Sequence, residues 1–221
     1  MCISITKINC DEEENTVQVL GRPNSVNVQK VMWCLAELGL KADRYDVGGA
    51  FGGNDRPDYL LQNPNGKIPT LIDGDYVLWE SNAIVRYLCD KSRSGSWYPD
   101  NAQKRGHANQ WMDWYQTTLH RPMTTLFWQL VRTEPQLQDQ GEINAAIAEC
   151  SAYWAILDQH LEQRRYILGA HITMADIPLG CAAYRWHRMV FDRPDLPALK
   201  AWWTLISERS DYQKHVMLPL T

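Results

Sequence analysis

The sequence lacks any apolar run that approaches the ~20 residues needed to span a bilayer. Its start, MCISITKINCDEEENT, has neither the basic region nor the apolar core of a secretory signal. Lys and Arg number 22 against 26 Asp and Glu, a formal charge of -4, so no broad positive field is available to gather phosphates. These features predict a cytoplasmic protein that binds neither membrane nor nucleic acid.

Metal and redox motifs are also missing. The 6 cysteines form no CxxC pair and no zinc spacing, and the 6 histidines form neither HxxxH nor HExxH. The glycine-rich stretch GGAFGGND lacks the Gly-Lys-Ser/Thr ending of a phosphate-binding loop. The sequence therefore predicts reduced thiols, no metal site and no nucleotide-type loop.

Strand and helix signals alternate in the first part of the chain. TVQVL predicts a strand, apolar residues then recur at helical spacing from Val28 to Leu38, and DRYDV predicts a second strand. TLI and YVLW flank Asp73-Gly74-Asp75, a hairpin signal, and Ser81 then begins a helix. This order is typical of a thioredoxin-like α/β domain.

The composition changes at DKSRSGSWYPDN, and no strand pattern follows it. Periodicity predicts only helices there, at 101–131, 142–163, 174–190 and 197–209. Most of the 10 tryptophans also lie in this part, which indicates wide aromatic packing surfaces. The predicted organisation is an unassigned extension at 1–15, a thioredoxin-like domain at 16–91 and an all-α domain at 98–221.

The stretch NPNGKIPTLIDGDYVLWES suggests a site for a short peptide. If the Ile68–Pro69 bond is cis, the backbone N–H and C=O of Ile68 face outward like a strand edge, with which a peptide can pair. Ser81 at a helix start favours an anion such as an α-carboxylate, and Glu80 can accept from an ammonium group. Lys67 can meet a second carboxylate.

Three segments together resemble the cytosolic glutathione transferase superfamily, in particular its serine-type, theta-like bacterial members. These are RPNSVNVQKVMWCLAELGL, NPNGKIPTLIDGDYVLWESNAIVRYL and ITMADIPLG. The resemblance implies that Ile68 pairs with the cysteinyl backbone of glutathione, that Glu80 and Ser81 hold its γ-glutamyl end, and that Lys67 faces its glycine carboxylate. The full glutathione-binding set that we expect is Asn24, Lys67, Ile68, Pro69, Glu80 and Ser81.

The resemblance also implies roles near the glutathione sulfur. Ser25 falls where serine-type relatives carry the hydroxyl that contacts the sulfur, and Asn27 falls where some relatives have an asparagine near the thiolate. From the residues alone, the N-cap of the first helix is the better explanation of Ser25, or of Asn24, and Asn27 is explained as well by a polar residue of the first turn.

The second substrate is expected between the Ser25 turn and an aromatic face of the first long helix. Trp111, Trp114, Tyr115 and Thr118 are the candidate pocket residues, although such a face more often packs against other helices. The predicted reaction is conjugation of glutathione, as co-substrate, to an electrophilic, apolar small molecule. Two alternatives stay open: a glutathione-dependent disulfide reductase or peroxidase, and a non-catalytic binding module. The resemblance further implies a homodimer and a role in detoxification.

Overall fold

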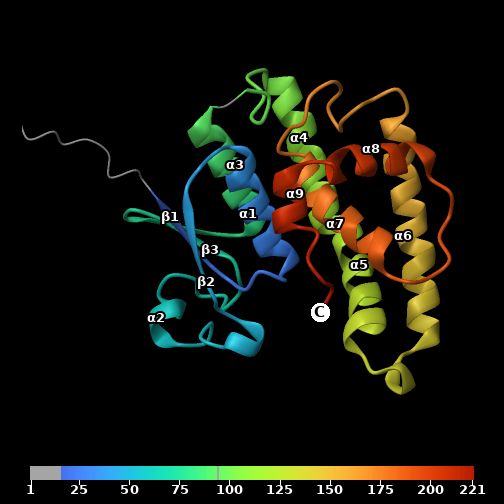
Figure 1. Cartoon of the computed structure of the whole chain (residues 1–221), viewed down its shortest axis with the longest axis horizontal. Coiled ribbons are helices and arrows are strands. Elements are labelled where there is room, and N and C mark those ends of the chain that lie inside the picture. The colour runs from blue at the N-terminus through green and yellow to red at the C-terminus, as the bar shows by residue number, and fades with distance from the viewer. Residues whose placement is uncertain (1–15, 94) are drawn as a thin grey trace, which may run out of the picture.

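The computed structural model describes residues 16–93 and 95–221, so the predicted extension at 1–15 lies outside the described residues. A four-stranded sheet and its helices form one half of the molecule, and helices form the other (Figure 1). This arrangement confirms the predicted fold class, a thioredoxin-like domain followed by an all-α domain. The boundaries between the two domains remain a prediction.

The sheet combines the predicted strand-helix-strand unit with the predicted hairpin. β1 (Val17–Leu20) pairs in parallel with β2 (Ala42–Tyr45), and its other edge pairs antiparallel with β3 (Thr70–Asp73). β4 (Tyr76–Trp79) pairs antiparallel with β3, which makes the order β2-β1-β3-β4. β4 is therefore the edge strand beside the start of the next helix.

Two helices lie between the sheet and the helical half (Figure 1). α1 (Val26–Glu37) follows β1, and α3 (Ser81–Ser92) follows β4 and begins at the predicted residue. The connection between β2 and β3 contains the short helices η1 (Gly49–Phe51) and α2 (Pro57–Leu60). The first turns of α1 and α3 lie close to the loop before β3, because all three contribute residues to one cavity.

The long helix predicted at 101–131 is one continuous helix with two π-helical turns. α4 (Ala102–Trp114) continues through η2 (Tyr115–Leu119) into α5 (His120–Phe127) and then η3 (Trp128–Arg132). π turns are uncommon and frequently lie at functional sites. Here η2 begins beside α1 and α3, so the wider turn falls where the two halves meet.

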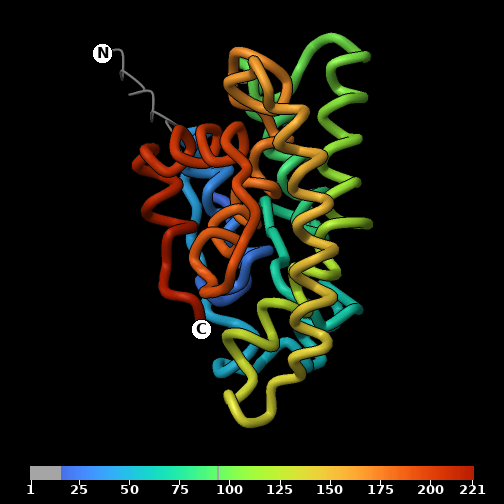
Figure 2. Tube along the Cα trace, turned by 90° about the vertical axis from the view of Figure 1, so that its right-hand side faces the viewer, coloured from blue at the N-terminus to red at the C-terminus, as the bar shows by residue number. Residues whose placement is uncertain are grey.

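The remaining predicted helices end within two residues of their expected limits. They are α6 (Gln140–Leu161), which follows the short η4 (Pro135–Leu137), α7 (Asp176–Arg188) and α8 (Pro197–Ser207). α5 and α6 run side by side along their length (Figure 2). The sequence pattern does not predict α9 (Ser210–His215), because its 6 residues are too few to show a helical repeat.

α1 packs closely against the helical half at Trp33. A Cβ on Gly180 of α7 would lie 2.8 Å from the Trp33 ring, so only glycine permits this approach. The Trp33 ring also lies 4.8 Å from the ring of Tyr212 in α9. Glu37, at the other end of α1, forms an ion pair with Arg209, which ties α9 to the sheet domain.

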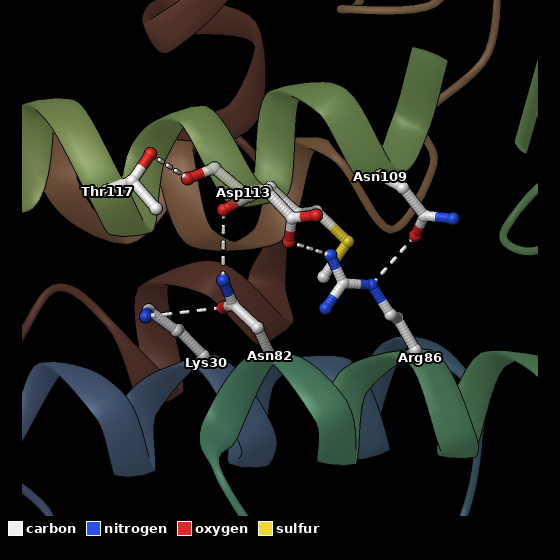
Figure 3. A network of polar contacts seen from close by, with 7 residues as sticks. Lys30, Asn82, Arg86, Asn109, Asp113 and Thr117 are labelled. Atoms are coloured by element: carbon white, nitrogen blue, oxygen red, sulfur yellow. Dashed lines mark hydrogen bonds and ion pairs between the residues drawn. The ribbon is translucent and has the colours of Figure 1, made fainter. Parts of the chain in front are cut away.

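Polar contacts join α3 to α4 (Figure 3). Asn82 donates from Nδ2 to the carbonyl oxygen of Met112 over 3.1 Å, and Arg86 donates from Nε to Asn109 over 2.7 Å. Arg86 also pairs with Asp113. These contacts hold the start of α3 in a fixed position relative to the π turn that follows α4.

The predicted capping pair Thr173 and Asp176 is present at the start of α7. The Asp176 carboxylate accepts from the Thr173 N–H over 2.9 Å and from the Ile167 N–H over 3.1 Å. It also accepts from the Trp202 indole N–H over 2.9 Å, and it is completely buried. Asp176 therefore links the loop before α7 to α8, a wider role than capping.

Replacing Asp176 with Ala is expected to destabilise the fold by about 3–5 kcal/mol, because it leaves several buried N–H donors unsatisfied at about 1–3 kcal/mol each. Asp176→Asn keeps one acceptor oxygen, so the free energy of unfolding should fall less in this variant than in Asp176→Ala. Urea unfolding followed by far-ultraviolet circular dichroism measures both. An equal loss of stability in the two variants would contradict the role of Asp176 as a hydrogen-bond acceptor.

Candidate active site

A cavity of about 240 Å³ lies where the loop before β3, the start of α3, α1 and the π turn η2 meet. It contains six of the predicted site residues: Asn27, Lys67, Ile68, Pro69, Glu80 and Ser81. Its other lining residues are Asn63, Asn65, Trp79 and Gln116. Segments that are far apart in the sequence therefore supply one concave surface.

The loop before β3 is held from below by side-chain hydrogen bonds. The Ile68–Pro69 peptide bond is cis. Tyr59 donates to the carbonyl oxygen of Lys67 over 2.5 Å, and the Asn63 amide donates to the same oxygen over 2.7 Å. Among the described residues, the N–H and C=O of Ile68 take part in no backbone–backbone hydrogen bond, so both can pair with an extended ligand.

Glu80 has an unusual backbone conformation at the start of α3. Its φ of 73° and ψ of 106° lie in a region that residues other than glycine rarely occupy, and such strain clusters at functional sites. Glu80 is the N-cap residue of α3, and its side chain makes no capping hydrogen bond. The free N–H groups and the positive dipole end of α3 therefore face the cavity beside Ser81, an arrangement that favours an anion.

A buried lysine lies directly beneath Ser81. Lys30 of α1 has no exposed surface, and its Nζ donates to Ser81 Oγ over 3.3 Å. The same Nζ donates to Asn82 Oδ1 over 3.4 Å (Figure 3). The same nitrogen lies 4.5 Å from the centre of the Tyr115 ring. Ser81 in turn donates to Asn27 Oδ1 over 3.3 Å. A chain of hydrogen bonds therefore runs from Lys30 to the cavity surface.

The pKa of Lys30 is lowered to about 7, chiefly by burial, with a smaller lowering by Arg185 that Cys181 and Glu80 oppose. Lysine is rarely buried without such partners. Near neutral pH, the ammonium group is close to its midpoint of titration. The charge beneath Ser81 therefore responds to small changes in pH or in the charges near the cavity.

Ser25 is the N-cap residue of α1, with the extended backbone typical of that position. Its hydroxyl makes no capping hydrogen bond, although the residue is only 9% exposed. Ser25 lies two residues before Asn27, which lines the cavity. Ser25 therefore occupies the N-cap position, as the alternative expects, but forms no side-chain cap, and its hydroxyl stays available for another partner.

Asn24 lies on the other side of the same turn. Its amide oxygen accepts from Arg22, and its amide nitrogen donates to the Thr221 hydroxyl. Both ends of this side chain are engaged away from the cavity. The predicted contact of Asn24 with a ligand thus has no support in the observed geometry.

The predicted aromatic face is divided between two environments. The Trp111 ring lies 4.5 Å from the His160 ring, and the Trp114 ring lies 6.2 Å from that of Tyr153, so both pack toward α6. Tyr115 is buried beneath Lys30, and Thr118 contacts Thr117. From this helix, Gln116 is the residue that lines the cavity.

Comparison with known proteins identifies the family. Residues 15–90 match the family model for the glutathione S-transferase N-terminal domain, and residues 140–203 match that for the C-terminal domain. Glutathione S-transferase GstB of Escherichia coli (strain K12) is 36% identical over 207 residues, which cover 93% of this chain and 100% of that protein. The chain belongs to the glutathione S-transferase family.

One solved structure and a further relative also belong to the glutathione S-transferases. A theta class glutathione S-transferase from Xanthomonas axonopodis pv. citri, solved with glutathione bound, is 43% identical with a TM-score of 0.90. That match covers 94% of this chain and 100% of the other. Glutathione S-transferase 3 of Zea mays is 31% identical over 220 residues, covering 90% of this chain and 93% of that protein.

Five residues at this transferase site are not among the predicted ones. Asn63 and Asn65 belong to the NPNG stretch before Lys67, so the sequence carries a signal for them. Trp79 ends a predicted strand, and Gln116 belongs to a predicted helix, but neither position indicates a cavity. Lys30 has the sequence character of a surface residue, because only the packing of α3 and η2 over α1 buries it.

Described residues contain no group of three or more His, Cys, Asp or Glu side chains arranged to hold a metal ion. The four described cysteines, Cys34, Cys89, Cys150 and Cys181, are buried and free. Burial raises the pKa of the Cys150 and Cys181 thiols to about 12, which keeps them protonated. The cavity therefore depends on hydroxyl, amide and charged side chains.

Replacing Lys30 with Met should change how stability depends on pH. The pKa of Lys30 is about 7 in the folded protein, against roughly 10.4 for an unfolded lysine. Between these values the unfolded state binds more protons, so this group raises the free energy of unfolding as pH increases, on the order of 1 kcal/mol per pH unit.

Chemical denaturation at several pH values tests this expectation. The wild-type protein should gain stability relative to Lys30→Met from about pH 7 to 10 and show no such change below about 7. Lys104→Met, at an exposed position, provides the control. If the free energy of unfolding depends on pH in the same way in the wild-type protein and in Lys30→Met, Lys30 has an ordinary pKa.

Proposed function

We propose that this transferase binds glutathione in the cavity as its thiolate and conjugates it to an electrophilic, apolar small molecule. The observation that carries the proposal is the convergence of Lys67, Ile68 and Ser81 on one cavity. This arrangement matches a short peptide with a carboxylate at each end and an extended backbone between. The solved relative from Xanthomonas axonopodis pv. citri, with glutathione bound, supports the same ligand.

Each part of glutathione has a partner in this proposal. The γ-glutamyl carboxylate accepts from Ser81 and the N-terminus of α3, while Glu80 accepts from the γ-glutamyl ammonium group. The cysteinyl backbone pairs with the N–H and C=O of Ile68, and Lys67 faces the glycine carboxylate. Pro69 keeps Ile68 at the cavity edge. Since Ser81 donates to Asn27 over 3.3 Å, glutathione binding would redirect that hydroxyl.

The chemistry requires a more acidic thiol. A cysteine thiol has a pKa of about 8.5, so only a few per cent is thiolate at neutral pH. Lowering the pKa by about two units requires about 2.7 kcal/mol of preferential binding to the anion. One hydrogen bond to a charged group supplies about 1.5–3 kcal/mol, so the free hydroxyl of Ser25 is sufficient with the α1 N-terminus nearby.

Asn27 is the second candidate near the sulfur. Its side chain lines the cavity and accepts from Ser81, which leaves its amide nitrogen free to donate toward the sulfur. In the proposed reaction, the sulfur forms a bond to the electrophilic carbon, and the leaving group departs with its bonding electron pair. The proton of the thiol passes to solvent when glutathione binds. No metal takes part.

Further elements of the proposal concern assembly and location. β4 is an edge strand with exposed apolar side chains at Tyr76, Val77 and Trp79, and an exposed apolar edge favours association. This supports a homodimer in which the sheet domain of one subunit packs against the helices of the other.

No helix among the described residues is long and apolar enough to cross a membrane. In this proposal the protein acts in the cytoplasm, and its role is detoxification.

Screening the purified protein with glutathione against four reagents tests the activity. The reagents are an aryl halide, an isothiocyanate, a hydroperoxide and a mixed disulfide. Turnover of either of the first two supports conjugation. Turnover only of the hydroperoxide or the disulfide would replace it with peroxidase or reductase chemistry, and binding without any turnover would leave a non-catalytic module.

Replacing Ser25 with Ala should raise the pKa of the bound glutathione thiol by about one to two units, because one hydrogen bond to the anion is lost. Conjugation at neutral pH should slow by roughly 3- to 25-fold, in proportion to the thiolate that remains, while the affinity for glutathione stays within about fivefold. Ultraviolet titration of the thiolate in the complex measures the pKa. An unchanged pKa would transfer the role to Asn27, for which Asn27→Ala is the matched variant.

Replacing Ser81 with Ala should have the opposite pattern. The loss of one charge-assisted hydrogen bond to the γ-glutamyl carboxylate should weaken glutathione binding by about tenfold or more. The thiol pKa in the saturated complex should stay unchanged, because Ser81 does not contact the sulfur. Calorimetric titration measures the affinity, and wild-type affinity in this variant would contradict the proposed orientation of the ligand.

A further inference from the structure

Lys30 lies at the inner end of a hydrogen-bond chain that ends at the cavity surface. Its Nζ donates to Ser81 Oγ over 3.3 Å, and Ser81 donates to Asn27 Oδ1 over 3.3 Å. Ser81 and Asn27 line the cavity, whereas Lys30 is completely buried. Lys30 therefore acts on a bound molecule without touching it, through the Ser81 hydroxyl.

Two further contacts fix the position of the Lys30 nitrogen. It donates to Asn82 Oδ1 over 3.4 Å (Figure 3) and lies 4.5 Å from the centre of the Tyr115 ring. Asn82 is held in turn, because its Nδ2 donates to the carbonyl oxygen of Met112 over 3.1 Å. A hydroxyl, an amide oxygen and an aromatic ring carry no negative charge. An anion that arrives at Ser81 therefore adds the charge that these contacts lack.

Titratable groups face Lys30 from the elements packed around it. They are Glu80 before α3, Tyr115 of η2, His120 of α5, and Cys181 and Arg185 of α7. Burial keeps the tyrosine, the cysteine and the histidine uncharged at neutral pH, since it raises the pKa of the first two groups and lowers the pKa of the third to about 4. The arginine stays charged, although burial lowers its pKa to about 10, and the glutamate is exposed. With a pKa of about 7, Lys30 is the buried member of this set that changes charge near neutral pH.

The protonation state of Lys30 determines where the Ser81 hydroxyl can donate. An ammonium group has three N–H donors and no acceptor, so the Ser81 proton points onward, toward Asn27 and the cavity. A neutral amine has a lone pair and can accept that proton, which leaves only oxygen lone pairs on the cavity side of Ser81. Since a carboxylate is an acceptor, only the ammonium form presents Ser81 as its donor.

The charge of Lys30 and the charge of the ligand also support each other. In the proposed orientation, the γ-glutamyl carboxylate accepts from Ser81 and ends this chain in place of the Asn27 amide. A nearby opposite charge favours the charged form of a titratable group, and linked hydrogen bonds strengthen one another in a protein interior. The bound carboxylate therefore stabilises the ammonium form, and the ammonium form stabilises the bound carboxylate by the same free energy.

We propose that Lys30 is a positioning residue for glutathione, which in its ammonium form turns the Ser81 hydroxyl toward the γ-glutamyl carboxylate and gains a proton when that carboxylate binds. The inference rests on the proposed function and adds a proton-coupled step to it. The Lys30 amine takes its proton from solvent, while the thiol of glutathione gives one to solvent. S-methylglutathione has no thiol proton, so its binding shows the Lys30 step by itself.

Carbon-13 NMR of protein labelled at the ε carbon of lysine measures this step directly. Exposed lysines titrate near about 10.4, so a resonance with a midpoint near about 7 belongs to Lys30. Saturating S-methylglutathione should raise that midpoint by about one unit or more. A midpoint that stays unchanged or falls in the complex would overturn the inference, and so would a free protein in which no lysine titrates below about 9.

The affinity for S-methylglutathione should depend on pH through the same residue. A shift of about one unit makes the ratio of wild-type to Lys30→Met affinity fall nearly tenfold, roughly, between pH 6 and pH 9. This ratio removes the titration of the ligand's own amino group, which both proteins share. Lys104→Met, at an exposed position, should match the wild type at each pH. A wild-type to Lys30→Met ratio that is the same at every pH would assign Lys30 a purely structural role.

These measurements separate a failure of this inference from a failure of the proposed function. Binding of S-methylglutathione with no movement of the Lys30 midpoint rejects the coupling and leaves the transferase site intact. Absence of binding at every pH removes the proposed function together with the inference that rests on it. The NMR titration uses the wild-type protein, so it decides the question even where Lys30→Met does not fold.

Discussion

The ammonium group of Lys30 is the contact on which the geometry of the site depends. It joins three elements, because its partners are the Ser81 hydroxyl, the Asn82 amide and the Tyr115 ring. A buried charge without such partners would cost several kcal/mol, so α1, α3 and η2 must stay together around it. An ammonium group can only donate, and it therefore occupies an acceptor site of Ser81 and directs that hydroxyl outward to the cavity.

Positive charge surrounds the cavity of a protein whose formal net charge is -4. The N-termini of α1 and α3, Lys67 at the loop and Lys30 beneath Ser81 all favour negative groups. Glutathione as a thiolate carries such groups at both ends and at the sulfur. The overall acidity of the chain hides this local field, which shows why net charge excludes broad nucleic-acid surfaces but says little about a small-molecule site.

The fold and the cavity edge follow from local signals. The strand pattern, the Asp73-Gly74-Asp75 turn and Ser81 predict the sheet and the start of α3, while the lysine before Ile68 and Pro69 predicts the loop that lines the cavity. Each of these features depends on residues close together in sequence. Backbone geometry and the local chemistry of turns and helix ends suffice to find them.

Contacts made only in three dimensions lie beyond such reasoning. Lys30 is an ordinary polar position of a helix until α3 and η2 cover it. Trp111 and Trp114 share a helical face with Tyr115, yet a π turn changes the direction of the residues after them, and Gln116 reaches the cavity instead.

Proton release on glutathione binding tests the central claim most directly. Calorimetric titrations at pH 7 in buffers of different ionisation enthalpy give the number of protons released per site. Because the free thiol has a pKa of about 8.5 and the bound thiol about two units less, glutathione should release about 0.7 proton more per site than S-methylglutathione, which has no thiol proton. Equal release by the two ligands, or no heat of binding for glutathione, would contradict a cavity built to hold its thiolate.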